Sequence, residues 1–179
     1  MRIDWQKFVQ HDDDNVRGFF GDYRWMSNFH VCDIRYGEDW YASTEHAYMA
    51  AKCANASDRR LFRTQGMTCA AARKLGQSVE LRKDWESVKF SVMLDVNYDK
   101  YLRHVELREK LLATGNRYIE ETNTWGDVYW GYDINKKQGD NRLGEILMRL
   151  RTLFQPPVLP NIVAVMNARR STQRFATGF

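Results

Sequence analysis

The 179-residue sequence contains no apolar run long enough to cross a membrane, and its first residues lack the apolar stretch of a secretory signal. A membrane-spanning helix needs roughly 18 to 20 consecutive apolar residues. A secretory signal needs an apolar segment close to the N-terminus. These two absences predict a cytoplasmic protein that does not associate with membranes.

Cysteine is scarce, and its spacing excludes two classes of small protein. Cys32, Cys53 and Cys69 are an odd number, widely spaced, with no CxxC pair and no histidine cluster nearby. They predict neither a disulfide framework nor a zinc site. Histidines and carboxylates also do not cluster at metal-ligand spacing, so we expect no metal and no cofactor.

The chain also has only a small excess of charge of one sign. The chain carries 27 Lys and Arg against 23 Asp and Glu, a net charge of +4. This excess suits a phosphorylated ligand but falls short of a nucleic-acid-binding signature. Much of it lies in Arg169, Arg170 and Arg174 near the C-terminus.

The residues that are present predict a folded α+β protein. With 44% hydrophobic and 13% aromatic residues, a chain of this length can bury one substantial core. We expect a single compact domain, with several helices around a small β-sheet. Its predicted strands are 16–20, a hairpin at 32–41, 117–122 and 128–132. Its predicted helices are 43–54, 58–62, 68–75, 84–112 and 141–154, and the loop 21–29 follows the first strand.

The predicted helix at 43–54 carries the most informative pattern. At about 100° per residue, its alanines gather on one side, whereas Glu45, Tyr48, Met49 and Lys52 gather on the other. Glu45 and Lys52 are separated by roughly 10 Å along the axis, too far for an i,i+4 ion pair, yet both can reach a ligand between them. A solvated charged face explains the pattern equally well. His46 lies off this stripe, and we expect it to be structural.

Two further segments have the character of binding elements. Trp125 and Trp130 flank a turn-like stretch and could stack on a heterocyclic base, although core packing explains them nearly as well. The segment 139–144 precedes the last helix, where free N–H groups could bind phosphate, with Asn141 and Gly144 nearby. Ordinary capping by Asp140 or Asn141 is the simpler interpretation.

Six motifs in fixed order resemble one known family. They are GDYRWMSNF, STEHAYMAAK, LRKDWESVKFSVM, LLATGN, NTWGDVYWG and QGDNRLGEILMRLR. Together they resemble the NADAR family (NAD- and ADP-ribose-associated), also called YbiA-like proteins, over residues 18 to 153. We therefore expect an N-terminal extension (1–15), a NADAR domain (16–154) and a basic C-terminal tail (155–179).

The resemblance implies an enzyme that hydrolyses N-glycosidic bonds. Some members cleave ribosylamino-pyrimidine phosphates, which are intermediates of riboflavin synthesis, and others remove ADP-ribose from guanine in nucleic acid. The partner is then a phosphorylated riboside or an ADP-ribosylated base, and nucleic acid enters only as a modified substrate. We favour the riboflavin intermediates, because a stand-alone domain suits the smaller ligand. A non-catalytic ADP-ribose-binding module is the rival interpretation.

The resemblance also implies which residues form the site. It places the catalytic acid at Glu45 and the amine at Lys52, and Asp127 is a further candidate carboxylate. It assigns Ser27, Asn28, Trp125, Gly126 and Trp130 to the pocket wall. We also expect Tyr48, from the face of the helix that carries Glu45, and Asn141 and Gly144, from the segment 139–144, to bind substrate. Met49 departs from the family pattern, because many relatives carry Gln there.

Two mechanisms use these residues. Lys52, when neutral, can displace the base through a Schiff base with the sugar, while Glu45 shuttles protons. Alternatively, departure of the base leaves an oxocarbenium-like centre, and Glu45 or Asp127 directs water onto it.

Overall fold

The computed structural model of the protein describes residues 10–156. Its helices are η2 (Gly21–Met26), α1 (Thr44–Ala51), α2 (Ala56–Leu61), α3 (Cys69–Gly76), α4 (Trp85–Arg103), α5 (Val105–Leu112) and α6 (Arg142–Phe154). Its strands are β1 (Gln10–His11), β2 (Asn15–Arg17), β3 (Val31–Tyr36), β4 (Asp39–Ser43), β5 (Tyr118–Glu120), β6 (Thr122–Asn123) and β7 (Tyr132–Asp133). The expected α+β class is confirmed.

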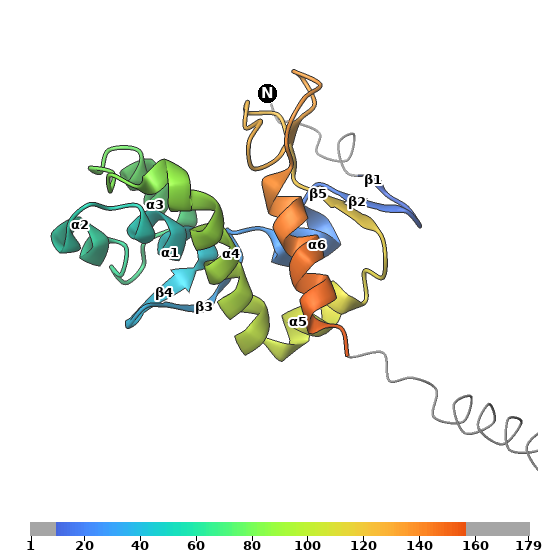
Figure 1. The fold of residues 1–179 in the computed structure, drawn as a ribbon, viewed down its shortest axis with the longest axis horizontal. Helices are drawn as coiled ribbons and strands as arrows, with labels where there is room; N and C mark the ends of the chain where they lie inside the picture. The colour runs from blue at the N-terminus through green and yellow to red at the C-terminus, as the bar shows by residue number, and fades with distance from the viewer. Residues whose placement is uncertain (1–9, 157–179) are drawn as a thin grey trace, which may run out of the picture.

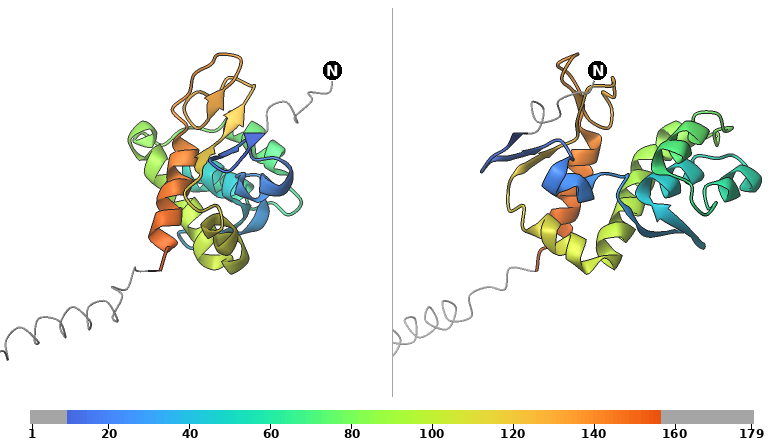
Figure 2. Two further views of the ribbon diagram at one scale, coloured as in Figure 1. Left: turned by 90° about the vertical axis from the view of Figure 1, so that its right-hand side faces the viewer. Right: turned by 180° about the vertical axis from the view of Figure 1, so that it is seen from behind.

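The strands form three small sheets, where the sequence predicted one. They have the orders β1-β2-β5, β3-β4 and β6-β7, with β2 parallel to β5 and β6 parallel to β7. In Figures 1 and 2, α4 runs through the middle of the molecule. The helices α1 to α3 and the β3-β4 hairpin lie on one side of it, and α6 and the three-stranded sheet lie on the other.

Most elements follow from local sequence signals. Ser43 caps α1 with its side chain, and Gly37, at φ 62°, makes the β3-β4 turn. On α4, Trp85, Val92 and Val96 are buried and Val88 packs against the core, so residues at helical spacing form one apolar stripe. The predicted helix 84–112 is interrupted at His104, whose backbone leaves the helical region and whose ring Nε2 lies 2.8 Å from the carbonyl oxygen of Asp33.

The predicted strand 128–132 is wrong except at its last residue. The carbonyl oxygens of Val128, Tyr129, Trp130 and Gly131 accept hydrogen bonds from the backbone N–H groups of residues 140–143, where α6 begins. This stretch therefore pairs with a helix start and cannot pair with a strand. A Cβ at Gly131 would lie 2.2 Å from the carbonyl oxygen of Glu121, and one at Gly139 would lie 2.1 Å from that of Gly131, so three backbone segments touch here.

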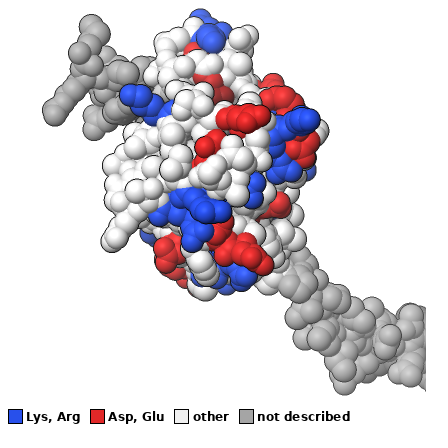
Figure 3. Space-filling model, turned by 90° about the vertical axis from the view of Figure 1, so that its left-hand side faces the viewer, with Lys and Arg blue, Asp and Glu red and all other residues white. Residues whose placement is uncertain are grey.

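The ends and the surface complete the fold. Residues 10–15, expected in an extension, form β1 and the first position of β2, while Arg169, Arg170 and Arg174 lie outside the described residues. No helix within residues 10–156 has the length and apolar character required to cross a membrane. Basic and acidic side chains are interspersed over the face shown in Figure 3, in agreement with the small net charge.

Candidate active site

The first residues of α1 are fastened to the loop that follows η2. The backbone N–H of Glu45 donates to the carbonyl oxygen of Asn28 at 3.0 Å. The Asn28 side chain is itself held, because its amide nitrogen lies 3.3 Å from the sulfur of Met93 and its oxygen accepts from Asn97. The loop that carries Ser27 and Asn28 thus lies next to Glu45.

The α1 helix is buried along its whole length, so a solvated charged face is excluded. Glu45 is only 6% exposed. Burial raises the pKa of Glu45 to about 7; Asp127 also raises it, whereas Arg73 and Lys52 lower it. This carboxyl group can exchange a proton near neutral pH. The His46 ring contacts Ser43 Oγ at 2.7 Å and the Met67 carbonyl oxygen at 3.1 Å, which is the expected structural role.

Lys52 follows the last residue of α1 and is partly buried. Burial lowers the pKa of its amine, and the neighbouring carboxyl of Glu45 acts in the opposite direction. A lysine of lowered pKa is neutral for a larger fraction of the time, as a nucleophilic amine must be.

The segment 123–130 is held rigid by buried side chains. Asn123 accepts hydrogen bonds from the N–H groups of Trp125 and Asp127 and donates to the Asp127 carbonyl oxygen at 2.7 Å. Gly126, at φ 90°, donates its N–H to Asp133 at 2.7 Å and so forms the turn between Trp125 and Asp127. The carboxyl of Asp127 accepts from the N–H of Trp130 at 2.9 Å. Gly126 therefore shapes the site and presents Trp125 and Asp127.

These segments enclose a catalytic hollow of about 110 Å³. It is lined by Ser27, Asn28, Phe29, Glu45, Tyr48, Met49, Arg73, Met93, Glu121, Trp125, Asp127 and Trp130. Two larger cavities share walls with it, one of about 340 Å³ that includes Trp125 and Glu121, and one of about 310 Å³ that includes Lys52. Within residues 10–156, no group of three or more His, Cys, Asp or Glu side chains is arranged to hold a metal ion.

Several residues of these walls were not foreseen. Arg73 on α3 lines all three cavities, and Glu121, which follows β5, lines two. Burial, together with the carboxyl groups of Asp127 and Glu45, raises the pKa of Glu121 to about 8, whereas Arg73 acts to lower it. Arg73 had no distinguishing signal in a basic helix, and Glu121 lay inside a predicted strand. Met49, the departure from the family pattern, lines two of the cavities.

Asn141 and Gly144 lie away from these cavities. The Asn141 amide donates to the carbonyl oxygen of Ile119 at 2.8 Å, and its oxygen accepts from the N–H of Glu121. A Cβ at Gly144 would lie 2.1 Å from the carbonyl oxygen of Ile119, so this glycine permits close packing of α6 on β5. Because the N–H groups of residues 140–143 are already bonded, a phosphate site at this helix start is contradicted.

Known proteins resemble this chain in sequence and in fold. N-glycosidase YbiA of Shigella flexneri serotype 5b is 38% identical over 148 residues, covering 80% of this chain and 91% of that protein. A riboflavin biosynthesis protein of Vibrio vulnificus is 28% identical over 175 residues, covering 96% of this chain and 45% of that protein. The NMR structure of the E. coli protein YbiA superposes with a TM-score of 0.69 at 33% identity, covering 85% of this chain and 89% of that chain.

The α+β fold, the buried acid and these relatives define the class of the protein as a hydrolase of N-glycosyl compounds. The expected enzyme class is thereby confirmed. The NADAR domain model matches residues 7–155, and the chain belongs to the NADAR family.

Proposed function

We propose that the enzyme hydrolyses the bond between C1′ of a phosphorylated ribose and the nitrogen of an aminopyrimidine, the chemistry of riboflavin intermediates. The observation that carries this proposal is the pairing of buried Glu45 on α1, which lines the catalytic hollow, with Lys52 directly after α1, which lines the adjoining cavity of about 310 Å³. The relative named as a riboflavin biosynthesis protein supports the choice of substrate.

In the mechanism we propose, Lys52 acts as the nucleophile. The sugar ring opens to an imine, and the neutral Nζ of Lys52 adds to C1′. The C1′–N bond to the base then breaks with its electron pair going to nitrogen, which takes up a proton. Water adds to the resulting lysyl imine, and its collapse returns the free amine and the sugar aldehyde. Glu45 moves protons between these steps, which suits a carboxyl group with a pKa of about 7.

Borohydride trapping tests this mechanism. Reduction during turnover should leave a stable sugar adduct on Lys52, visible by peptide mass spectrometry. Lys52→Met should remove both the adduct and the activity, whereas Lys74→Met, on an exposed position of α3, should retain both. Repeated failure to trap an adduct, together with an active Lys52→Met variant, would replace this route by direct attack of water.

Parallel release assays test the substrate. The enzyme, Glu45→Ala and Lys52→Ala are each incubated with a ribosylamino-pyrimidine phosphate and with ADP-ribosylated guanine, and the free base is measured. We expect release from the pyrimidine riboside by the unaltered enzyme alone. Release only from guanine would move the proposal to ADP-ribosylated nucleic acid, and binding of ADP-ribose without any release would identify a non-catalytic module.

A further inference from the structure

The catalytic hollow is too small to hold the whole of the proposed substrate. Its volume is about 110 Å³, whereas sites for small molecules occupy roughly 300 to 1,000 Å³. A ribose has a base on one side and a phosphate on the other, so at least one of them must extend into a neighbouring cavity. The two neighbours differ in character, and that difference can orient the substrate.

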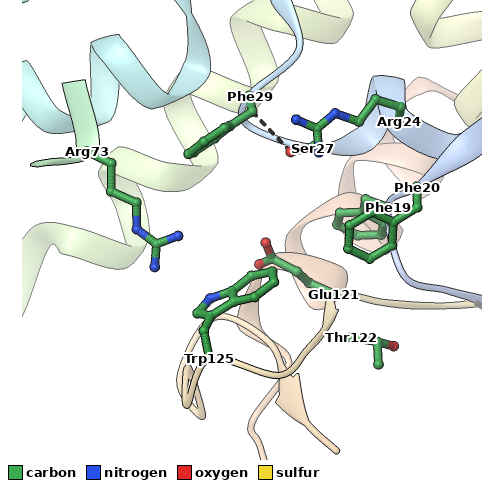
Figure 4. Close-up of a pocket in the computed structure, with 9 residues that line it drawn as sticks. All are labelled: Phe19, Phe20, Arg24, Ser27, Phe29, Arg73, Glu121, Thr122 and Trp125. Carbon is green, nitrogen blue, oxygen red and sulfur yellow. Dashed lines mark hydrogen bonds between the residues drawn. The ribbon is translucent and has the colours of Figure 1, made fainter. Parts of the chain in front are cut away.

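One neighbour, here called the aromatic chamber, has a volume of about 340 Å³. Phe19, Phe20, Phe29 and Trp125 supply rings from three separate stretches of the chain. Figure 4 shows Glu121 at the wall of this chamber, with its carboxyl group beside the Trp125 ring and turned away from Phe19 and Phe20. Trp125 is 45% exposed, with the Arg73 guanidinium 5.9 Å from its ring centroid.

The other neighbour, here called the lysine-lined hollow, is lined by both Lys52 and Lys89. Its rings are packed on one another: Tyr48 meets Trp130 edge to face at 5.6 Å, and Trp130 meets Tyr129 edge to face at 4.8 Å. The ammonium group of Lys89 lies 4.2 Å from the Tyr129 ring centroid. Lys52 lines this hollow and does not line the aromatic chamber.

Building on the function proposed above, we propose that the aromatic chamber holds the departing base and that Glu121 is a second catalytic acid, which protonates its nitrogen. Flat heterocycles stack favourably on aromatic side chains, which suits the chamber. Glu121 lines both the chamber and the catalytic hollow, so it lies where the C1′–N bond crosses between them. Lys52 and Glu121 then act on C1′ from different sides.

The proposed step balances as follows. The C1′–N bond breaks, its electron pair stays on nitrogen, and the proton of Glu121 passes to that nitrogen. Carbon C1′ is by then bonded to Lys52, and the water that later releases the sugar returns a proton to the Glu121 carboxylate. Burial raises the pKa of Glu121 to about 8, so the carboxyl group is protonated at neutral pH and able to donate.

The base-binding part is tested without turnover. Calorimetry with 5,6-diaminouracil and with ribose 5-phosphate measures the two halves of the substrate separately. Trp125→Ala should weaken aminopyrimidine binding by about tenfold or more, while ribose 5-phosphate binding stays within about twofold. Trp40→Ala is the matched control, because Trp40 is 49% exposed with the Arg103 guanidinium 4.6 Å from its ring, and it should change neither. Selective loss of ribose 5-phosphate binding, or equal loss of both ligands, would overturn the assignment.

The acid is tested with two leaving groups. Glu121→Gln should lower kcat by about 100-fold or more for the ribosylamino-pyrimidine phosphate. For N-ribosyl-4-nitroaniline 5-phosphate, whose weakly basic nitrogen needs less protonation, the loss should be much smaller. Equal losses on both substrates would remove Glu121 from the acid role. Exposed Glu109→Gln serves as control. If the unaltered enzyme releases no base, the proposed function itself fails, whereas the binding experiment still reports on the chamber.

Discussion

Glu45 is buried, although the chemistry proposed for it requires an ionisable group. Its carboxyl is 6% exposed on a helix that is buried throughout. In the folded protein it keeps its proton up to a pH of about 7, whereas its ordinary pKa is 4.5. Because the folded state binds a proton that the unfolded chain releases in this interval, stability falls as the pH rises through about 7.

Glu45→Gln should therefore lower the activity and raise the stability of the folded protein at high pH. The change from 4.5 to about 7 corresponds to roughly 3 kcal/mol. Above pH 8 the variant should be more stable than the unaltered enzyme by up to about this amount, and below pH 4.5 the two should differ little. Urea unfolding at both pH values measures the difference. Exposed Glu109→Gln should show no such dependence, and equal stabilisation by Glu45→Gln at both pH values would contradict the explanation.

The sequence predicted some site residues and could not predict others. Glu45 and Lys52 could be proposed from the sequence because helical spacing alone places them on one face. Arg73 on α3 and Glu121, which follows β5, line the same hollow as Glu45, and no local sequence pattern predicts that they meet there. Only the packing of distant segments reveals them.

Among the elements, the segment after β6 is held in part by one buried amide, the side chain of Asn123. Asn123→Ala would leave the N–H groups of Trp125 and Asp127 without their present acceptor, which costs about 1 to 3 kcal/mol. We expect lower stability in urea and a raised KM, because Trp125 would lose its fixed position. Asn135→Ala removes one exposed hydrogen bond to the Thr124 carbonyl oxygen and is the matched control. Equal effects of the two variants would contradict this account.

The contact between α3 and α1 offers a second prediction. A Cβ at Gly76 would lie 2.2 Å from the sulfur of Met49, a side chain that lines the catalytic hollow. Because methionine is flexible and alanine favours helix by about 1 kcal/mol, Gly76→Ala should change stability little. It should instead displace Met49 and lower kcat/KM.

Combining Gly76→Ala with Met49→Ala measures the coupling of the two positions. The second substitution makes room for the new methyl group, so the double variant should lose less activity than the sum of the single variants. Additive losses would show that the substitution at Gly76 acts through contacts other than the one with Met49.

Element boundaries were predictable where the signal is local. The hairpin expected at 32–41 appears as β3 and β4 around Gly37, and the helix expected from residue 43 begins directly after the Ser43 cap. The strand expected at 128–132 fails because its carbonyl oxygens bond to N–H groups of residues 140–143. Sequence periodicity shows which residues are apolar, but it does not show which groups their backbone N–H and C=O groups will hydrogen-bond.

For the whole molecule, the cavity walls lie between Phe19 and Trp130, inside the family match at 7–155. A chain ending at residue 156 should therefore cleave the ribosylamino-pyrimidine phosphate with unchanged kcat/KM. Release assays on that substrate and on ADP-ribosylated guanine in nucleic acid measure the effect. A loss confined to the nucleic acid would assign the basic tail to recruiting that substrate.

The close passage of backbone at Gly131 and Gly139 bears on how substrate preference can be re-engineered. Neither position has space for even a methyl group, because Gly131 abuts the carbonyl oxygen of Glu121 and Gly139 abuts that of Gly131. Libraries that seek an altered base should thus randomise Met49 or Trp125 and spare the two glycines. A new substrate specificity would then come from changed side chains, while the backbone of the site stays as it is.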